Sequence, residues 1–444
     1  MKVFQNKEQE KAYRESPVLL QVLMLFLLAV GLYLITVGLG YSEQDRTLVL
    51  DNPLVQEGSD PLSRILFSDS RGDIQGSPGS TFLSGQYRPL AIMSYVLEKR
   101  FVGHNAFVAH WVNILIYAFI AAVLFLFLRV LFKFYYQKPW YLTLPLLAAA
   151  LYIVHPLHSG VVAHISQRDE LLAMFWSLLS LHFVLLYIDH RRQAYLVLIF
   201  ISYFLALLSK EISLSLLLLA PLMVWVFRDE PVKKILILLI PMVVALFLYG
   251  YLRMEALGFG SGWPVQTALS SSVYPQASAA DRFATLLFAF LLYLRMLFFP
   301  VPLEEASYIA VDLASFHDPL VYVSFILWGG IILFALIKIW HKDVIAFCIL
   351  LFLITFAGYS NVFFTSGSRV SEQYMFFPSL SVVIIASYFI NQTLRRLIKT
   401  RIIYKRLTMY LVIVLLIAAS AQTIHRNLRM GKFSAQQTEN TMAK

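Results

Sequence analysis

The polar stretch HPLHSGVVAHISQRDELL lies between two strongly apolar runs, and its side chains are of types that perform acid–base and phosphate chemistry. It supplies imidazoles at His155 and His158 and an Arg-Asp-Glu triplet at Arg168, Asp169 and Glu170. In a chain that is 59% hydrophobic, each such group needs water, a partner or a function. Three interpretations compete: a solvated loop between membrane helices, the lining of a transport path, or a site for a charged substrate at the membrane surface.

Ionisable residues outside this stretch extend the candidate site. Glu43 and Asp45 follow the first apolar run, Arg88 lies in the loop after it, and Lys210 falls between two later apolar runs. Two of them have a structural alternative: Asp45 as a solvated loop acid, and Lys210 in an ion pair with Glu211 or snorkelling from a helix end. The two acids of the triplet would equally suit the first turn of a helix.

The composition identifies membrane-spanning helices as the elements that must position these groups. The chain has 444 residues, a mean hydropathy of +0.70 and 14% charged residues, against about 25% in soluble domains. The net charge of +10 is explained by Lys and Arg on cytoplasmic loops, so no nucleic-acid partner is expected. The single cysteine, Cys348, excludes an internal disulfide and a cysteine metal site.

The apolar runs predict an all-α polytopic membrane protein. A bilayer needs about 20 apolar residues per crossing helix. The predicted spans are 17–40, 106–132, 140–157, 170–189, 194–209, 212–228, 234–253, 318–338, 343–358, 374–391 and 408–424. A further run at 282–300 contains Arg295 and is expected to be interfacial or re-entrant, which gives about eleven crossings, with twelve as the alternative.

The charge pattern places the candidate groups on one face of the membrane. Basic clusters fall in alternate loops, so the N-terminus is expected in the cytoplasm, and the polar stretch, Lys210 and the loop 41–105 are expected outside. That loop is too long for a simple connector, and GQYRPLAIMSYVLEKRF predicts an interfacial helix with Arg88 near its start. We expect one transmembrane domain over 1–424 and a disordered polar tail over 425–444.

Several motifs together resemble one enzyme family. They are the stretch from His155 to Leu172, LLSKEISL around Lys210, the YRPL of the outer loop, and the later segments YLRMLFFPVPL and SEQYMFFPSL. These are similar to the transmembrane and tetratricopeptide-repeat O-mannosyltransferase family and its bacterial relatives, within the GT-C superfamily of polytopic glycosyltransferases. The similarity runs along nearly the whole chain. The repeat array is missing, which fits a bacterial member and leaves the acceptor open.

The resemblance implies transfer of a sugar from a polyprenyl-phosphate carrier on the periplasmic or lumenal side, here of the bacterial inner membrane. Displacing a phosphate from an anomeric carbon with inversion needs a carboxylate to take the acceptor's proton and cations to hold the departing phosphate. By resemblance, Asp45 is the base, with Glu43 as a nearby substitute.

The remaining candidate residues take binding roles by the same resemblance. Arg88, Arg168 and Lys210 would hold the carrier phosphate, and His155 and His158 would donate to phosphate or sugar hydroxyls. A metal on the two histidines is disfavoured because the proline between them opposes a regular helix.

The triplet acids match a second acidic motif of the family. There Asp169 or Glu170 would orient the acceptor, position the base or hold a divalent metal, and these alternatives stay open. The expected partners are a polyprenyl-phosphate sugar donor, a protein or glycan acceptor, membrane lipids, and a subunit that replaces the missing repeats. The basic segment from Arg395 to Arg406 predicts contact with anionic inner-leaflet lipids.

Four departures from the family pattern each remove a charge: Gln44, Gly160, Gln373 and Ala306. Two explanations follow, a divergent enzyme, which we favour, or a catalytically degenerate subunit that binds a lipid-linked glycan or a partner protein without transfer. A transporter or flippase would predict ionisable residues through mid-membrane helices and a two-fold internal repeat, and the sequence has neither.

Overall fold

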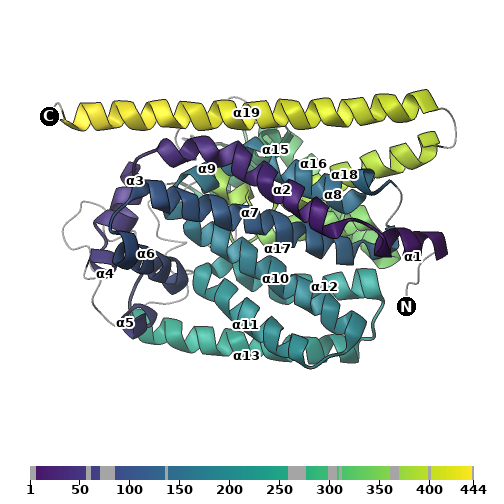
Figure 1. Cartoon of the computed structure of the whole chain (residues 1–444), viewed down its shortest axis with the longest axis horizontal. Helices are drawn as coiled ribbons and strands as arrows, with labels where there is room; N and C mark the ends of the chain where they lie inside the picture. Colours follow the sequence, from purple (N-terminus) through teal and green to yellow (C-terminus); the bar gives the residue numbers. More distant parts are fainter. Residues whose placement is uncertain are drawn as a thin grey trace.

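The computed structural model is largely helical, and its long helices form one bundle (Figure 1). The described residues are 7–56, 62–70, 86–135, 139–258, 277–298, 308–309, 313–360, 370–398 and 402–442. Within these ranges, one short β-pairing joins β1 (Tyr308–Ile309) to β2 (Val370–Ser371), antiparallel. The predicted all-α class is confirmed.

Seven helices in the described part of the chain are long and apolar enough to cross a bilayer. A hydrocarbon core about 30 Å thick needs about 20 residues at about 1.5 Å each. The seven are Val18–Gly38, Ala106–Leu131, Ile165–His190, Glu211–Arg228, Lys233–Leu257, Pro319–His341 and Met409–Met430. Each coincides with a predicted apolar run, so the chain is a multi-pass membrane protein.

The run predicted as one span over 140–157 is broken. α8 (Leu144–Ile153) and the following segment, Pro156–Ala163, meet at an angle of 50°. Pro156 has no backbone N–H and disfavours helical geometry at the residue before it. That residue, His155, is extended, with φ −69° and ψ 123°. The break therefore lies at the start of the polar stretch.

Three shorter apolar helices bear on the number of crossings. They are α11 (Ala194–Ser209), α17 (Val344–Phe356) and most of α18 (Ser379–Ile398). Each is shorter than an upright crossing helix needs. The predicted total of about eleven crossings requires the bent pair and all three of these to cross as well. The interfacial or re-entrant placement of α15 (Ala279–Phe298) stays a prediction.

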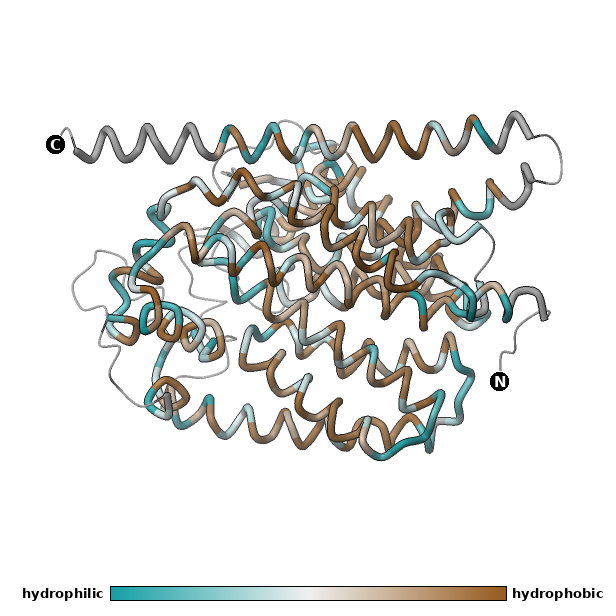
Figure 2. The backbone as a smooth tube through the Cα atoms, in the orientation of Figure 1, coloured by the Kyte–Doolittle hydropathy of each residue, from teal (hydrophilic) through white to brown (hydrophobic). Residues whose placement is uncertain are grey.

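The bundle is organised around α7 (Ala106–Leu131) and α10 (Arg168–His190). α10 packs against α7 and α11, and α7 also packs against α2 (Val18–Tyr33). Tyr117 and Phe125 of α7 are fully buried in this packing. Lipid tails are as apolar as the helices, so close packing and interhelical polar contacts hold such helices together. Figure 2 shows hydrophobic residues along the bundle and hydrophilic residues mainly at its two ends.

The described parts of the segment 41–105 cover one end of the bundle, at the left in Figure 1. An apolar cluster that includes Ile65 and Tyr95 packs its helices together. The amphipathic helix predicted near Arg88 is confirmed as a helix, and its place in the membrane interface stays a prediction. The helices are α3 (Glu43–Asp45), α4 (Pro53–Gln56), α5 (Leu62–Leu66) and α6 (Pro89–Val102).

The C-terminal segment corrects one prediction. The disordered tail expected over 425–444 is wrong, because α19 is one continuous helix over Ile402–Met442. A polar composition without proline does not oppose a helix, and many of these residues are good helix formers. Polar contacts attach α19 to the bundle: Thr423 donates to the Val154 carbonyl at 2.8 Å, and Asn427 donates to a carbonyl of α2 at 3.1 Å.

Candidate functional site

The polar stretch folds into a run of short turns between α8 and α10. η6 (Pro156–His158), α9 (Ser159–Ala163) and η7 (Ile165–Gln167) follow one another before α10 begins. Asp169 and Glu170 therefore lie in the first turn of α10, where backbone N–H groups lack partners within the helix. Asp169 Oδ1 accepts the Glu170 N–H at 2.8 Å. The first-turn placement expected as a structural alternative is present, together with the contacts described next.

Asp169 is the point at which two cations from distant parts of the chain meet. Its Oδ2 accepts a hydrogen bond from Arg88 Nη1 at 2.5 Å and lies 3.1 Å from Lys210 Nζ. Arg88 precedes α6, and Lys210 precedes η8 (Glu211–Ser215). The structure thus brings together three residues that the sequence predicted for one site.

Glu170 lies on the other side of Lys210. The lysine Nζ donates to Glu170 Oε1 at 2.6 Å, and the Tyr359 hydroxyl lies 2.7 Å and 2.8 Å from the two carboxylate oxygens. Tyr359 stacks on Tyr374, with ring centroids 4.7 Å apart and 9° between the planes. Tyr374 belongs to the motif SEQYMFFPSL, so this late motif reaches the triplet through Tyr359, a residue that the sequence analysis missed.

Glu211 connects Arg88 to a further cation. Its Oε1 accepts from Arg253 Nη1 at 3.0 Å, and its Oε2 lies 3.5 Å from Arg88 Nε. Arg253 Nη1 also lies 3.2 Å from the Tyr249 hydroxyl. The sequence analysis missed Arg253, and the only available signal was a charge at the end of an apolar run.

We call these six residues the ionic cluster: Arg88, Asp169, Glu170, Lys210, Glu211 and Arg253. Its three cations balance its three acids. The side chains of Asp169 and Lys210 are both 5% exposed, whereas those of Arg88 and Glu211 are 24% and 26% exposed. The cluster is therefore buried at Asp169 and partly exposed at Glu211.

The cations of the cluster keep their charge. Burial alone would lower the pKa of Arg88, but the Asp169 and Glu211 carboxylates raise it above its ordinary value. Burial would also lower the pKa of Lys210, yet Asp169 and Glu170 raise it. Within the described residues, no group of three or more His, Cys, Asp or Glu side chains is placed to hold a metal ion.

Asp45 lies beside the cluster and not in it. Its carboxylate oxygens accept the backbone N–H groups of Ser42 at 3.0 Å and Ser166 at 2.7 Å. Together with the Ser42 hydroxyl, which accepts from Asp45 N, this forms a capping box. Ser166 precedes α10, so Asp45 is bound at the same end of that helix as Asp169, with 1% of its surface exposed. Glu43 is exposed and makes no contact with the cluster in the described structure.

Arg168 packs between helices, away from the cluster. Its Nε donates to Asn113 Oδ1 at 2.9 Å, and its Nη2 donates to the Ala109 carbonyl at 3.1 Å and lies 2.9 Å from Glu98 Oε2. Its guanidinium carbon is 4.6 Å from the centre of the Tyr95 ring. These contacts tie α10 to α6 and α7, so Arg168 positions the start of α10.

Both predicted histidines are held within the protein. His158 is fully buried, with the Tyr117 hydroxyl 2.9 Å from Nδ1 and the Ser379 hydroxyl 3.0 Å from Nε2. His155 Nε2 lies 3.1 Å from the Leu297 carbonyl, and its Nδ1 accepts a backbone N–H of its own turn. Because both nitrogens of each ring are engaged, neither histidine joins the cluster.

One departure from the family pattern lies beside a second ion pair. Glu372 and Arg426 of α19 form a buried pair, and Arg426 also donates to the Pro156 carbonyl at 2.8 Å. A side chain at Gly160 would meet Glu372 Oε2 at 3.6 Å and Arg426 Nη2 at 3.9 Å. Glu372 thus places a carboxylate next to Gly160, one of the four positions that depart from the family pattern. Ala306 lies outside the described residues.

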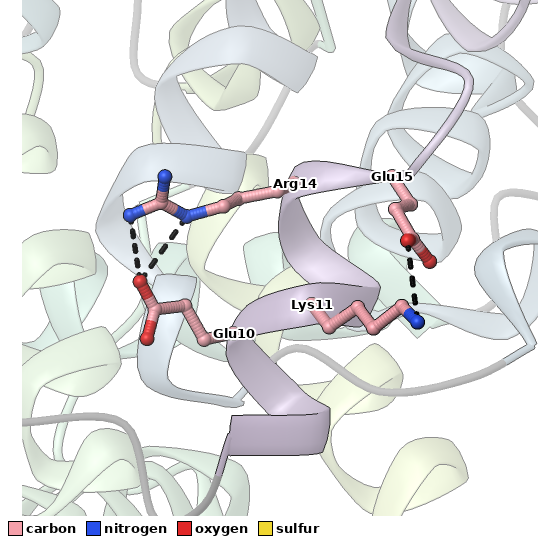
Figure 3. A pocket seen from close by; sticks show the side chains of 4 residues that line it. All are labelled: Glu10, Lys11, Arg14 and Glu15. Carbon is pink, nitrogen blue, oxygen red and sulfur yellow. Dashed lines mark hydrogen bonds and ion pairs between the residues drawn. The ribbon is translucent and has the colours of Figure 1, made fainter.

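A hollow elsewhere on the surface, drawn in Figure 3, is lined by Glu10, Lys11, Arg14 and Glu15, at and just beyond α1 (Lys7–Arg14). Arg14 pairs with Glu10 at 2.7 Å, and Lys11 pairs with Glu15 at 3.7 Å, each four residues apart. Exposed pairs of this kind contribute little free energy. The hollow shares no residue with the ionic cluster and has no feature of a substrate site.

The sequence matches curated O-mannosyl-transferases. It is 31% identical over 195 residues to Tmtc1 of Drosophila melanogaster, covering 44% of this chain and 21% of that protein. It is 27% identical over 365 residues to F38B6.6 of Caenorhabditis elegans, covering 81% of this chain and 49% of that protein. The chain is related to these transferases. The predicted resemblance is confirmed. The chain spans about half or less of the length of the two curated proteins.

Two further comparisons were made. No family model matches the sequence. The structure is similar to the archaeal oligosaccharyltransferase AglB from Archaeoglobus fulgidus, in complex with an inhibitory peptide and a dolichol-phosphate. The TM-score is 0.44 with 13% sequence identity, covering 94% of this chain and 55% of that chain. At this level of similarity, the activity has to be argued from the chain's own residues.

Proposed function

We propose that this chain transfers a sugar from a polyprenyl-phosphate carrier to a protein or glycan acceptor. The observation that carries the proposal is the ionic cluster, where Arg88 and Lys210 meet on Asp169. Preorganised cations of this kind stabilise the charge of a departing phosphate. The relationship to O-mannosyl-transferases supports a hexose, with mannose as the first candidate.

In the proposed reaction, the acceptor hydroxyl gives its proton to Asp45 while its oxygen bonds to the anomeric carbon with inversion. The bond from that carbon to the phosphate oxygen breaks, and its electron pair leaves with the phosphate, which the cations of the cluster bind. The two N–H groups on Asp45 fix its carboxylate and leave a lone pair on each oxygen for the proton. Glu43 is the substitute base, and Asp169 orients Arg88 and Lys210.

We further propose that the site faces the periplasm of a bacterial inner membrane and that the N-terminus is cytoplasmic. The cluster lies at the start of α10, whereas Arg191 follows the end of that helix and Lys133 follows the end of α7. Basic residues at this opposite end agree with the preference of Lys and Arg for the cytoplasmic side. A separate acceptor-presenting subunit and anionic lipids near Arg395–Arg406 complete the proposed partners.

A second candidate function is binding without transfer, as a degenerate subunit. One observation favours it: both oxygens of Asp45 accept backbone N–H groups, and the residue is 1% exposed, as in a purely structural cap. Such a protein would bind a lipid-linked glycan or a partner through the same cations.

The experiment uses the full chain in lipid nanodiscs with radiolabelled polyprenyl-phosphate sugars and cell lysate as the acceptor source. Wild type is compared with Asp45→Asn and Lys210→Ala, and Asp51→Asn, an exposed acid of the same loop, is the matched control. Transfer by wild type and Asp51→Asn that is lost in Asp45→Asn supports the enzyme. Binding of the carrier lipid that Lys210→Ala weakens, without transfer from any donor, supports the binding subunit.

A further inference from the structure

Glu211 holds an unusual position within the ionic cluster. Its two carboxylate oxygens face two different guanidinium groups, Arg253 at 3.0 Å and Arg88 at 3.5 Å. Planar guanidinium forks match carboxylate and phosphate equally well. The carboxylate thus occupies the place that an external anion would take between the two arginines.

The cluster borders a helix whose outer side is apolar. α13 (Val232–Leu257) runs along one edge of the bundle (Figure 1) and carries Arg253 near its end. Its side chains at Phe247 and Tyr251 are 74% and 52% exposed, whereas Tyr249, next to Arg253, is 1% exposed. In a bilayer, the exposed side chains of α13 would contact lipid tails, at the end of the bundle where Arg253 meets Glu211.

Glu211 is also the most exposed acid of the cluster. Its side chain is 26% exposed, against 5% for Asp169 and 3% for Glu170. Asp169 would still neutralise Arg88 if Glu211 moved into water. An incoming anion could therefore replace the Glu211 carboxylate without uncovering a buried unpaired charge, which would be costly.

We propose that Glu211 occupies the site of a lipid phosphate between Arg88 and Arg253, and that a polyprenyl-phosphate lipid entering along α13 displaces it. This inference rests on the proposed function and adds the entry side, a third phosphate-binding residue in Arg253, and an internal competitor in Glu211. While no lipid is bound, the negative charge of Glu211 reduces the repulsion between the two guanidinium groups and holds them in place.

The test measures binding of tritiated farnesyl phosphate to the full chain in phosphatidylcholine nanodiscs, with farnesol as the uncharged probe. Glu211→Gln removes the competitor and is expected to tighten binding about tenfold, and Arg253→Gln is expected to weaken it about tenfold. Glu230→Gln is the matched control, because Glu230 also bridges two cations, Arg191 at 2.5 Å and Lys234 at 2.9 Å, but at the opposite end. The affinity of Glu230→Gln for farnesyl phosphate should equal that of wild type.

Three results would overturn the inference: Glu211→Gln that binds no more tightly than wild type, Arg253→Gln that binds as tightly as wild type, or inorganic phosphate that competes as well as farnesyl phosphate. If Glu211→Gln does not fold, the Arg253→Gln result decides. Transfer assays on the same samples separate the two proposals. Transfer by wild type with unchanged binding in Glu211→Gln overturns this inference alone, and the expected binding pattern without transfer overturns the proposed enzyme alone.

Discussion

Paired charges gather at both ends of α10, and the two groups are built differently. At the end opposite the ionic cluster, Asp189 pairs with Lys133 at 2.7 Å and with Arg228 at 2.9 Å. Arg228 also donates to the Val130 carbonyl at 2.8 Å, near the last turn of α7. We call Lys133, Asp189 and Arg228 the Asp189 cluster.

The difference lies in what the cations contact. Arg228 satisfies helix carbonyls as well as a carboxylate, and its side chain is 4% exposed, so it cannot leave without uncovering buried polar groups. Among the described residues, in contrast, the charged partners of Arg88 are carboxylates, and one of these, Glu211, is partly exposed. Cations that face only acids can exchange a partner for a ligand, whereas cations that also close a helix end serve stability.

The largest effect on stability is expected for Arg228→Leu in the Asp189 cluster. Removing one partner of a buried ion pair lowers the free energy of unfolding by roughly 3–5 kcal/mol. Unfolding in mixed micelles, followed by tryptophan fluorescence, measures the loss. Arg191→Leu is the control, because Arg191 is 38% exposed and its pair should contribute less than about 1 kcal/mol. Equal losses of unfolding free energy in the two variants would contradict a stabilising role of the Asp189 cluster.

Lys210→Met is expected to abolish sugar transfer at a smaller cost in stability. Tyr359 still donates to Glu170 and Arg88 still pairs with Asp169, so we expect a loss of about 2–3 kcal/mol. The measurement combines the same unfolding assay with the transfer assay. Full transfer by a folded Lys210→Met protein would show that this cation has no role in the reaction.

Tyr359→Phe removes only the hydroxyl that bonds Glu170 at 2.7 Å and 2.8 Å. Loss of a hydrogen bond to a charged group should cost about 1.5–2 kcal/mol. The aromatic stacking on Tyr374 is kept, which makes the variant specific for the hydroxyl. Tyr374→Phe, compared in the same unfolding assay, reports what a hydroxyl on the neighbouring ring contributes.

The smallest effect is a pH dependence at the end of the bundle that carries the ionic cluster. Burial lowers the pKa of His164 below its ordinary value of 6.5, although the nearby Asp45 acts in the opposite direction. Below pH 6.5 the unfolded chain therefore binds more protons than the folded one, so stability falls as the pH drops. Between pH 6.5 and about 5.5, this group contributes a loss of at most about 1 kcal/mol. The slope should be shallower in His164→Asn, and an unchanged slope would assign it to other groups.

The sequence was informative about the spans and about which groups share one end of the bundle. Hydropathy located the helices, and the alternation of basic loops placed Arg88, Lys210 and the triplet on one side, where three of the predicted residues do meet. Adjacent residues of a helix point about 100° apart, however, and hydropathy does not specify the rotation of each helix. Arg168 and Asp169 therefore looked equivalent in sequence, and only Asp169 reaches the cluster.

The residues that sequence reasoning missed had no local signal. Tyr359 follows an apolar helix outside any recognised motif, and Arg253 ends another. Their importance depends on contacts with Glu170 and Glu211, which are 189 and 42 residues away along the chain. The polar composition after Arg426 does not specify the backbone conformation, which explains the wrong prediction of a disordered tail.

α19 is much longer than one membrane crossing needs. Its 41 residues extend about 60 Å, roughly twice the thickness of a hydrocarbon core. The apolar part ends at Met430, and the helix continues to Met442, about 18 Å further. Because Thr423 and Arg426 attach the helix to the bundle just before this extension, the extension starts from a fixed point on the bundle.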